Sequence, residues 1–111
     1  MVLAYASNKY GFKHMFNDKE MLSNVVKYIS YINPNADLNW IDVSNITDMS
    51  ELFYRLNVTT NFDVSKWDVS HVETMKGMFS NCIGFNCDIS KWNVSSVKNM
   101  SYMFYKCHSF N

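Results

Sequence analysis

One phrase occurs twice, with few changes, in this chain of 111 residues, and it constrains the fold more than any other feature of the sequence. It reads DVSKWDVSHVETMKGMF at 63–79 and DISKWNVSSVKNMSYMF at 88–104. A more divergent third copy, WIDVSNITDMSELFYRLNVTTNF, runs over 40–62 with one residue inserted after Trp40. Aligning the two later copies superposes Ser65 on Ser90, Trp67 on Trp92, Val72 on Val97, Met75 on Met100, Phe79 on Phe104, Cys82 on Cys107 and Phe85 on Phe110. Repeats of this length indicate stacked units, none of which buries its apolar face alone.

The apolar spacing changes halfway along each copy. Trp67 and Val69 alternate as in a short strand, whereas Val72 and Met75 recur at helical spacing. Ser70 stands between the two patterns, where its hydroxyl would cap the first turn of a helix. Each copy is therefore predicted to form a strand, a tight corner and a short helix. The predicted fold class is α+β, a short right-handed solenoid of about three strand–short-helix rungs.

The residues before the repeats show a different pattern. An amphipathic helix is predicted between a capping box at Asn17 and Glu20 and a stop at Pro34. Its apolar face comprises Met21, Val25, Ile29 and Ile32. Because the first rung of a stack needs its open apolar end covered, this helix is predicted to be an N-terminal cap. The predicted division is an N-terminal capping segment at 1–37 and a repeat solenoid at 38–111.

The phrase D-[IV]-S-x-W-[DN]-V-S-x-V-x-x-M-x-x-M-F closely resembles the repeat of BspA-like bacterial surface proteins. That repeat is a relative of leucine-rich repeats, and it occurs in many mycoplasma lipoproteins as a domain of unknown function. The resemblance covers Trp40 to Asn111, and residues 1–37 look like the N-terminal entry segment of that family. It implies a leucine-rich-repeat-like solenoid used in adhesion or protein recognition, with no established catalysis.

Charge and hydropathy argue against several classes of function. Ten Lys and Arg balance ten Asp and Glu without any basic run, so nucleic acid and anionic membranes are poor partners. No stretch approaches the ~20 apolar residues of a membrane span, and the first residues do not resemble a secretory signal. As written, the chain is expected in the cytoplasm, as a small inhibitor or adaptor from a phage or mobile element. If it is a piece of a larger exported protein, it is expected at the cell surface as part of an adhesin.

No catalytic, metal-binding or cofactor-binding set of residues emerges. The three cysteines form no C-x-x-C pair, and no histidine lies at ligand spacing from another histidine or a cysteine. Two of the cysteines share one repeat position and are expected to stack as small apolar core residues. Two columns of oxygen ligands that calcium could use are possible. One aligns Asp63 with Asp88, and the other aligns Asp42 with Asp68 and Asn93. We expect an Asx-type turn at each of these corners instead, because Asn93 replaces Asp without disturbing the phrase.

The positions that the repeat leaves free form three columns. They are Glu51, Gly77 and Tyr102; Tyr54, Ser80 and Tyr105; and Arg55, Asn81 and Lys106. These positions follow or interrupt the apolar face of the predicted helices, so most of them should face solvent. Tyr and Arg are enriched at binding hot spots. The predicted function is therefore that of a non-enzymatic module that binds a partner protein.

The third copy reaches Phe110-Asn111, the point at which the second copy continues into the next strand. Stacks of this kind expose the apolar face and the unpaired edge of the last rung unless something covers them. An open end is therefore predicted at Trp92, Met103, Phe104, Cys107 and Phe110, closed by a partner protein or by a second copy of the chain in a homodimer. The candidate partner-binding residues are Glu51, Tyr54, Arg55, Tyr102, Tyr105, Lys106, His108 and Phe110.

Overall fold

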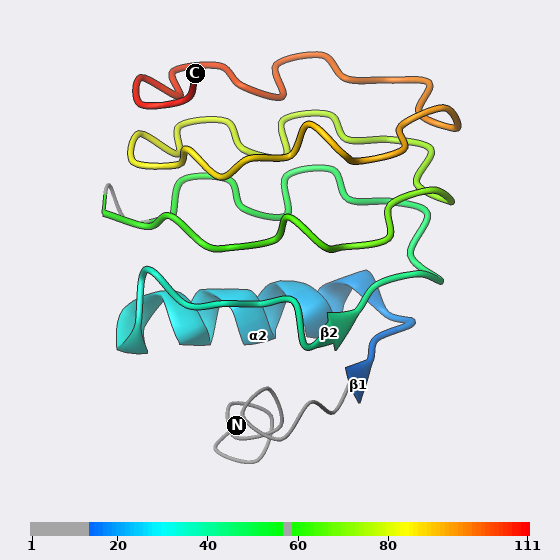
Figure 1. Cartoon of the computed structure of the whole chain (residues 1–111), viewed down its shortest axis with the longest axis horizontal. Coiled ribbons are helices and arrows are strands. Elements are labelled where there is room, and N and C mark those ends of the chain that lie inside the picture. The colour runs from blue at the N-terminus through cyan, green and yellow to red at the C-terminus, as the bar shows by residue number, and fades with distance from the viewer. Residues whose placement is uncertain (1–13, 57–58) are drawn as a thin grey trace.

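The chain winds in successive turns that lie one above another in a computed structural model, which describes residues 14–56 and 59–111 (Figure 1). The described part of the chain starts with a short strand, β1 (His14–Met15), followed by helix α2 (Lys19–Ile32) and a second strand, β2 (Ile41–Asp42). β1 and β2 pair in parallel. No helix within the described ranges is both long and apolar enough to cross a membrane.

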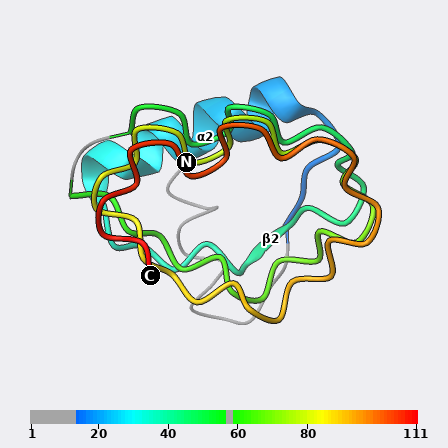
Figure 2. The same ribbon diagram turned by 90° about the horizontal axis from the view of Figure 1, so that it is seen from above.

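Four layers follow from the alignment of the repeats. The first contains α2 and residues 33–43. The second contains residues 44–56 and 59–69, the third residues 70–94 and the fourth residues 95–111. Seen from above, the layers superpose around a shared interior (Figure 2). Single parallel bridges connect them, as between Asp48 and Thr74 and between Thr74 and Asn99.

The predicted fold class is wrong. The α+β, leucine-rich-repeat-like solenoid would place a strand and a short helix in every copy. Among the described residues, however, the regular elements are β1, α2 and β2, and all three end by Asp42. From residue 43 onward the layers consist of turns, bends and isolated bridges.

The backbone hydrogen bonds of residues 75–82 explain why no helix forms there. An α-helix requires each amide to donate to the carbonyl four residues earlier in the same segment. Here every second amide leaves the segment: the amides of Met75, Gly77, Phe79 and Asn81 donate to carbonyls of the fourth layer. The amides of Met78, Ser80 and Cys82 donate to the carbonyl three residues back, as in consecutive turns, and the amide of Lys76 donates to the hydroxyl of Thr74. Gly77 and Asn81 also have φ of 62°, a left-handed conformation that a right-handed helix cannot include.

α2 does not act as the predicted N-terminal cap. It runs along one side of the first layer, on the same side as the turn segments of the layers above, and residues 33–42 run along the other side (Figure 2). Its buried face comprises Leu22, Val25, Val26, Ile29 and Ser30. Met21 and Ile32, which were predicted for that face, are exposed. The predicted N-cap is also displaced, because Asp18 rather than Asn17 accepts the amide hydrogen bond of Glu20.

Aspartate and asparagine side chains form the corners of the layers. Asp63 Oδ1 accepts hydrogen bonds from the amide of Ser65 at 3.0 Å and from its hydroxyl at 2.7 Å. The same Asx-type turn occurs at Asp37, Asp42, Asp48, Asp68, Asp88, Asn93 and Asn99. The prediction that these side chains hold their own corners is confirmed. The hydroxyl of Ser70 donates to Asp68 at 2.6 Å and caps no helix.

Aromatic rings stack from layer to layer in the core. Phe53, Phe79 and Phe104 form one column, with ring centroids 5.2 and 5.7 Å apart and nearly parallel planes. Trp67 and Trp92 each donate an indole N–H to a backbone carbonyl of the layer below. The buried apolar side chains of α2 belong to the same cluster as those of the repeats, so one core runs through all four layers. The division at residue 37 stays a prediction.

Candidate protein-interaction site

The fourth layer exposes residues whose counterparts are buried in the layers below. The side chain of Met75 is 0 % exposed, whereas that of Met100, one repeat later, is 43 % exposed. Three further positions show the same difference. Their side chains are buried in the third layer, whereas in the fourth layer they are half-buried, at Phe104, Cys107 and Phe110. This surface, made of Met100, Tyr102, Phe104, Tyr105, Lys106 and Phe110, is called the C-terminal face below. Trp92 and Met103, which were also predicted for the open end, are buried.

A row of backbone amides lies along the C-terminal face. In the third layer, the amides of Met75, Gly77, Phe79 and Asn81 donate to the layer above at 2.7 to 3.0 Å. The corresponding amides in the fourth layer belong to Met100, Tyr102, Phe104 and Lys106. Within the described part of the chain, these four amides make no hydrogen bond. The last layer therefore presents donors that the preceding layers use for stacking.

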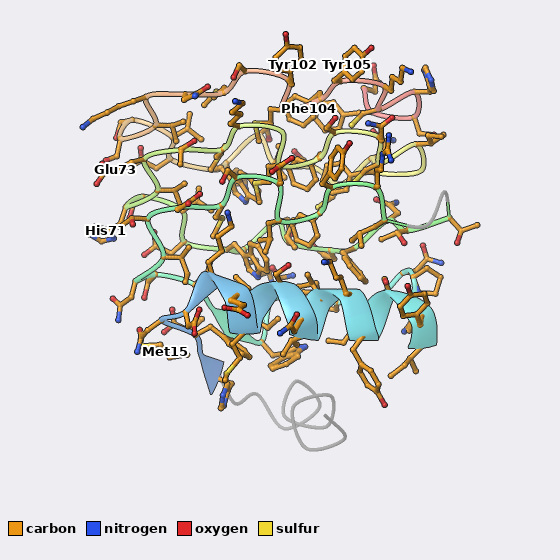
Figure 3. All side chains as sticks on the ribbon, turned by 180° about the vertical axis from the view of Figure 1, so that it is seen from behind. Met15, His71, Glu73, Tyr102, Phe104 and Tyr105 are labelled. Atoms are coloured by element: carbon orange, nitrogen blue, oxygen red, sulfur yellow. The ribbon has the colours of Figure 1, made fainter. Side chains whose placement is uncertain are left out.

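Three of the predicted site residues meet on this face. Tyr102 and Tyr105 are 68 % and 50 % exposed, and their rings contact edge to face with centroids 5.9 Å apart. Lys106 Nζ lies 5.4 Å from the centroid of the Tyr105 ring. Figure 3 shows both tyrosine side chains standing above Phe104 at the outer edge of the stack. Amphipathic rings held by a neighbouring ring and a cation suit protein contact, because they bury large areas with little loss of side-chain freedom.

The other predicted residues do not join this cluster directly. Tyr54 and Arg55 form their own pair, with the guanidinium carbon 5.3 Å from the ring centroid. They lie two layers below Tyr105, a backbone separation of roughly 10 Å at the usual spacing of hydrogen-bonded neighbours. Glu51, in the same layer as Tyr54, is exposed, as is His108 beyond the tyrosine cluster.

The third layer interrupts the three variable columns with small residues. Gly77 and Ser80 are buried and Asn81 is half-buried, so the columns do not form one continuous surface of large side chains. Phe110, the remaining predicted site residue, is half-buried on the C-terminal face, and its ring stacks on that of Phe104 with centroids 4.3 Å apart.

Backbone conformation accounts for two of the three variable columns. Glu51, Gly77 and Tyr102 have φ of 57°, 62° and 59°, and Arg55, Asn81 and Lys106 have φ of 56°, 62° and 59°. These are left-handed turn positions rather than the helical positions expected from the sequence. Glycine suits such a position, and other side chains are strained there.

The cysteines are free, and two of them lie in the core between layers. The thiols of Cys82 and Cys107 donate to the carbonyls of Phe53 and Phe79 in the layer below. Burial raises the pKa of Cys82 to about 12 and also raises the pKa of Cys107. Both side chains are therefore neutral thiols near pH 7, as expected for small core residues.

A solvent-open depression lined by His71, Glu73 and Lys98 is an alternative to the C-terminal face. Figure 3 shows His71 and Glu73 on one side of the stack. Lys98 Nζ lies 3.7 Å from a carboxylate oxygen of Glu73, and both side chains are exposed. His71 Nδ1 lies 3.5 Å from the hydroxyl of Ser70, but that hydroxyl donates to Asp68. In a catalytic triad the histidine stands between the hydroxyl and the carboxylate, whereas here the hydroxyl stands between the other two.

Metal binding has no support from the described residues, which contain no group of three or more His, Cys, Asp or Glu side chains able to hold an ion. Asp63 instead serves its corner turn. Burial raises the pKa of its carboxyl. The hydrogen bonds from the amide and hydroxyl of Ser65 lower it, and hydrogen bonding outweighs burial, so the pKa lies below its usual value.

Two parts of this site were not predicted from the sequence. Met100 was aligned with Met75 but not expected to be exposed, and the amide row was not identified. Both follow from the alignment of the repeats once the direction of the stacking hydrogen bonds is known, but only the structure shows that direction.

Comparison with known proteins identifies the family of the chain. Neither a search of curated proteins nor a search of solved structures finds a match. The family model described as "Mycoplasma protein of unknown function, DUF285" matches residues 11–111, which include all three copies of the repeat. The chain therefore belongs to the DUF285 family of mycoplasma proteins of unknown function.

Proposed function

We propose that this protein is a non-enzymatic module that binds another protein through its C-terminal face. The observation that carries the proposal is the contrast between Met75, which is fully buried, and Met100, which occupies the same repeat position and is 43 % exposed. An apolar surface that each lower layer buries against its neighbour suits burial by a partner. The tyrosine pair of Tyr102 and Tyr105 borders this surface and supplies side chains typical of interface hot spots.

We also propose a kinship between this repeat and that of the BspA-like surface proteins, which are relatives of leucine-rich repeats. The long shared phrase supports it, and the family match is compatible with it. Adhesion or protein recognition is the use that this kinship suggests.

The test is to identify a partner by affinity capture from the native source and mass spectrometry, and then to measure its affinity with purified components. Replacing Tyr102 and Tyr105 by Ala should weaken binding by about tenfold or more, as expected when hot-spot side chains are truncated. Tyr28 and Tyr31, which are exposed on α2, provide the matched control. If the control pair reduces binding and the Tyr102 and Tyr105 pair does not, the C-terminal face is not the binding site.

A further inference from the structure

The hydrogen bonds between layers have a direction, and this direction selects what can cover the C-terminal face. The central bonds run upward: the amides of residues 75, 77, 79 and 81 in the third layer donate to carbonyls of the fourth. The bonds on either side run downward. The amide of Lys98 donates to the carbonyl of Glu73 at 2.7 Å, and the amide of Ser109 donates to the carbonyl of Ile83 at 3.1 Å.

The four central upward bonds and one of the flanking downward bonds also occur one layer lower, so they recur with the repeat. The amides of Met49, Glu51, Phe53 and Arg55 donate upward to the third layer at 2.9 to 3.1 Å. The amide of Glu73 donates downward to the carbonyl of Thr47 at 2.7 Å.

The C-terminal face therefore carries an ordered row of backbone groups. Its four central donors are the amides of Met100, Tyr102, Phe104 and Lys106. The carbonyls of Lys98 and His108 flank them, at the positions that accept in the layer below. None of these six groups has a backbone partner among the described residues. A matching surface must present one donor, four acceptors and one donor in that order.

A second copy of the chain related by a twofold axis does not match. It would bring an identical row against this one, so central donors would face donors. Unpaired amides in a dry interface are unfavourable. A symmetric homodimer through the C-terminal face, one of the partners expected from the sequence, is therefore disfavoured.

Head-to-tail stacking of folded copies is blocked by a different feature. The matching lower surface of the second layer faces α2, which runs directly beneath it (Figure 1). Lys19 on this helix donates to the side chain of Ser50 at 2.8 Å and lies 3.4 Å from Asp48. In a second folded copy, this surface of the second layer is therefore already occupied by the first layer of that copy.

We propose that the occupant of the C-terminal face is a further segment of the same repeat, with its lower surface not already occupied by another layer. Such a segment has four acceptor carbonyls in the required positions and a donor amide at each end. The inference rests on the proposed function, since it specifies the partner of the same face.

The side chains of a repeat segment would match the face as well. Its phenylalanine at the position of Phe104 would extend the ring column, in which successive centroids are 5.2 and 5.7 Å apart. Its cysteine thiol would donate to the carbonyl of Phe104, as Cys107 donates to that of Phe79. A column of asparagines would also continue. In this column the amide of Asn86 donates to the side chain of Asn61, and the amide of Asn111 donates to the side chain of Asn86.

A synthetic peptide with the sequence of residues 88–111 tests the proposal when it is added to the full chain. It should bind in a titration up to about 1 mM, the upper limit of weak specific binding, whereas a scrambled peptide of the same composition should not. The variant Met100→Lys should weaken binding by at least about tenfold, because it places a charge in the apolar contact. Met21→Lys is the matched control, since Met21 is 57 % exposed on α2 and lies outside the face.

Amide hydrogen exchange of the same samples reports the backbone pairing itself. In the free protein, the amides of residues 75, 77, 79 and 81 should be protected and those of residues 100, 102, 104 and 106 should exchange freely. Saturating peptide should protect the second set. Binding without this protection, or binding that Met100→Lys and Met21→Lys reduce equally, would overturn the inference.

The outcomes separate this inference from the proposed function. If the peptide fails to bind but a purified partner still binds through Tyr102 and Tyr105, the repeat-segment occupant is wrong and the binding function stands. A concentration-dependent dimer that Met100→Lys abolishes would also contradict the inference, because it would show that two like faces associate.

Discussion

The two methionines at positions 75 and 100 offer a direct measurement of how the last layer differs from the one below. They have the same side chain at the same repeat position, but Met75 is 0 % and Met100 is 43 % exposed. Met75→Ala removes fully buried atoms and leaves a cavity between layers. Such substitutions cost about 2 to 5 kcal/mol of unfolding free energy.

Met100→Ala should cost less for two reasons. Because 43 % of the side chain is already exposed, a transfer free energy of about 1.5 to 3 kcal/mol scales down to about 1 to 1.7 kcal/mol. The space it leaves opens to solvent, so the cavity contribution is small. The two variants should therefore differ by about 2 kcal/mol, which corresponds to about 10 °C in Tm for a domain of this size.

Urea and thermal unfolding followed by tryptophan fluorescence and circular dichroism would measure both losses. The measurements should be repeated at several protein concentrations, because association through the C-terminal face would bury Met100. Equal losses in the two variants at low concentration would show that Met100 is packed like Met75, and the exposed face would then not exist in solution.

Three further predictions concern the core, the backbone and pH. Trp67→Ala should cost about 3 to 5 kcal/mol in a denaturant titration, because the ring is buried between layers; a loss under about 1 kcal/mol would contradict this packing. Gly77→Ala should cost about 1 kcal/mol because its φ is 62°, whereas Tyr102→Gly at the equivalent position should cost less; a larger loss in Tyr102→Gly would refute the backbone explanation. Because the folded-state pKa of Asp63 lies below its unfolded value, the carboxylate stabilises the fold above about pH 4, and this contribution is lost as the pH falls through the folded pKa. Asp63→Asn should keep the corner, as Asn93 does, but should show a smaller loss of stability between pH 7 and pH 3 in urea titrations; an unchanged loss would assign the acid sensitivity to other groups.

The sequence determined which residues superpose, and the structure agrees with that alignment at several levels. The repeat relates Trp67 to Trp92, and each indole donates to a carbonyl of the layer below. The corner role of Asp63 and its counterparts was also predictable, because Asn replaces Asp at equivalent corners and both side chains form Asx turns. These features depend on residue identity and on the repeat, and both can be read from the sequence.

Only the tertiary structure decided the conformation of each layer. Met75, Met78 and Phe79 have helical spacing, but alternate amides in this segment bond to the next layer, so the preference of the isolated segment does not decide its conformation. The same interactions between layers set the left-handed residues and the direction of the hydrogen bonds. A pattern within one copy cannot reveal that direction, because a backbone amide and a carbonyl are present in every non-proline residue. The exposed donors of the C-terminal face therefore follow from the stacking of copies, in which each layer supplies the hydrogen-bond partners of its neighbour.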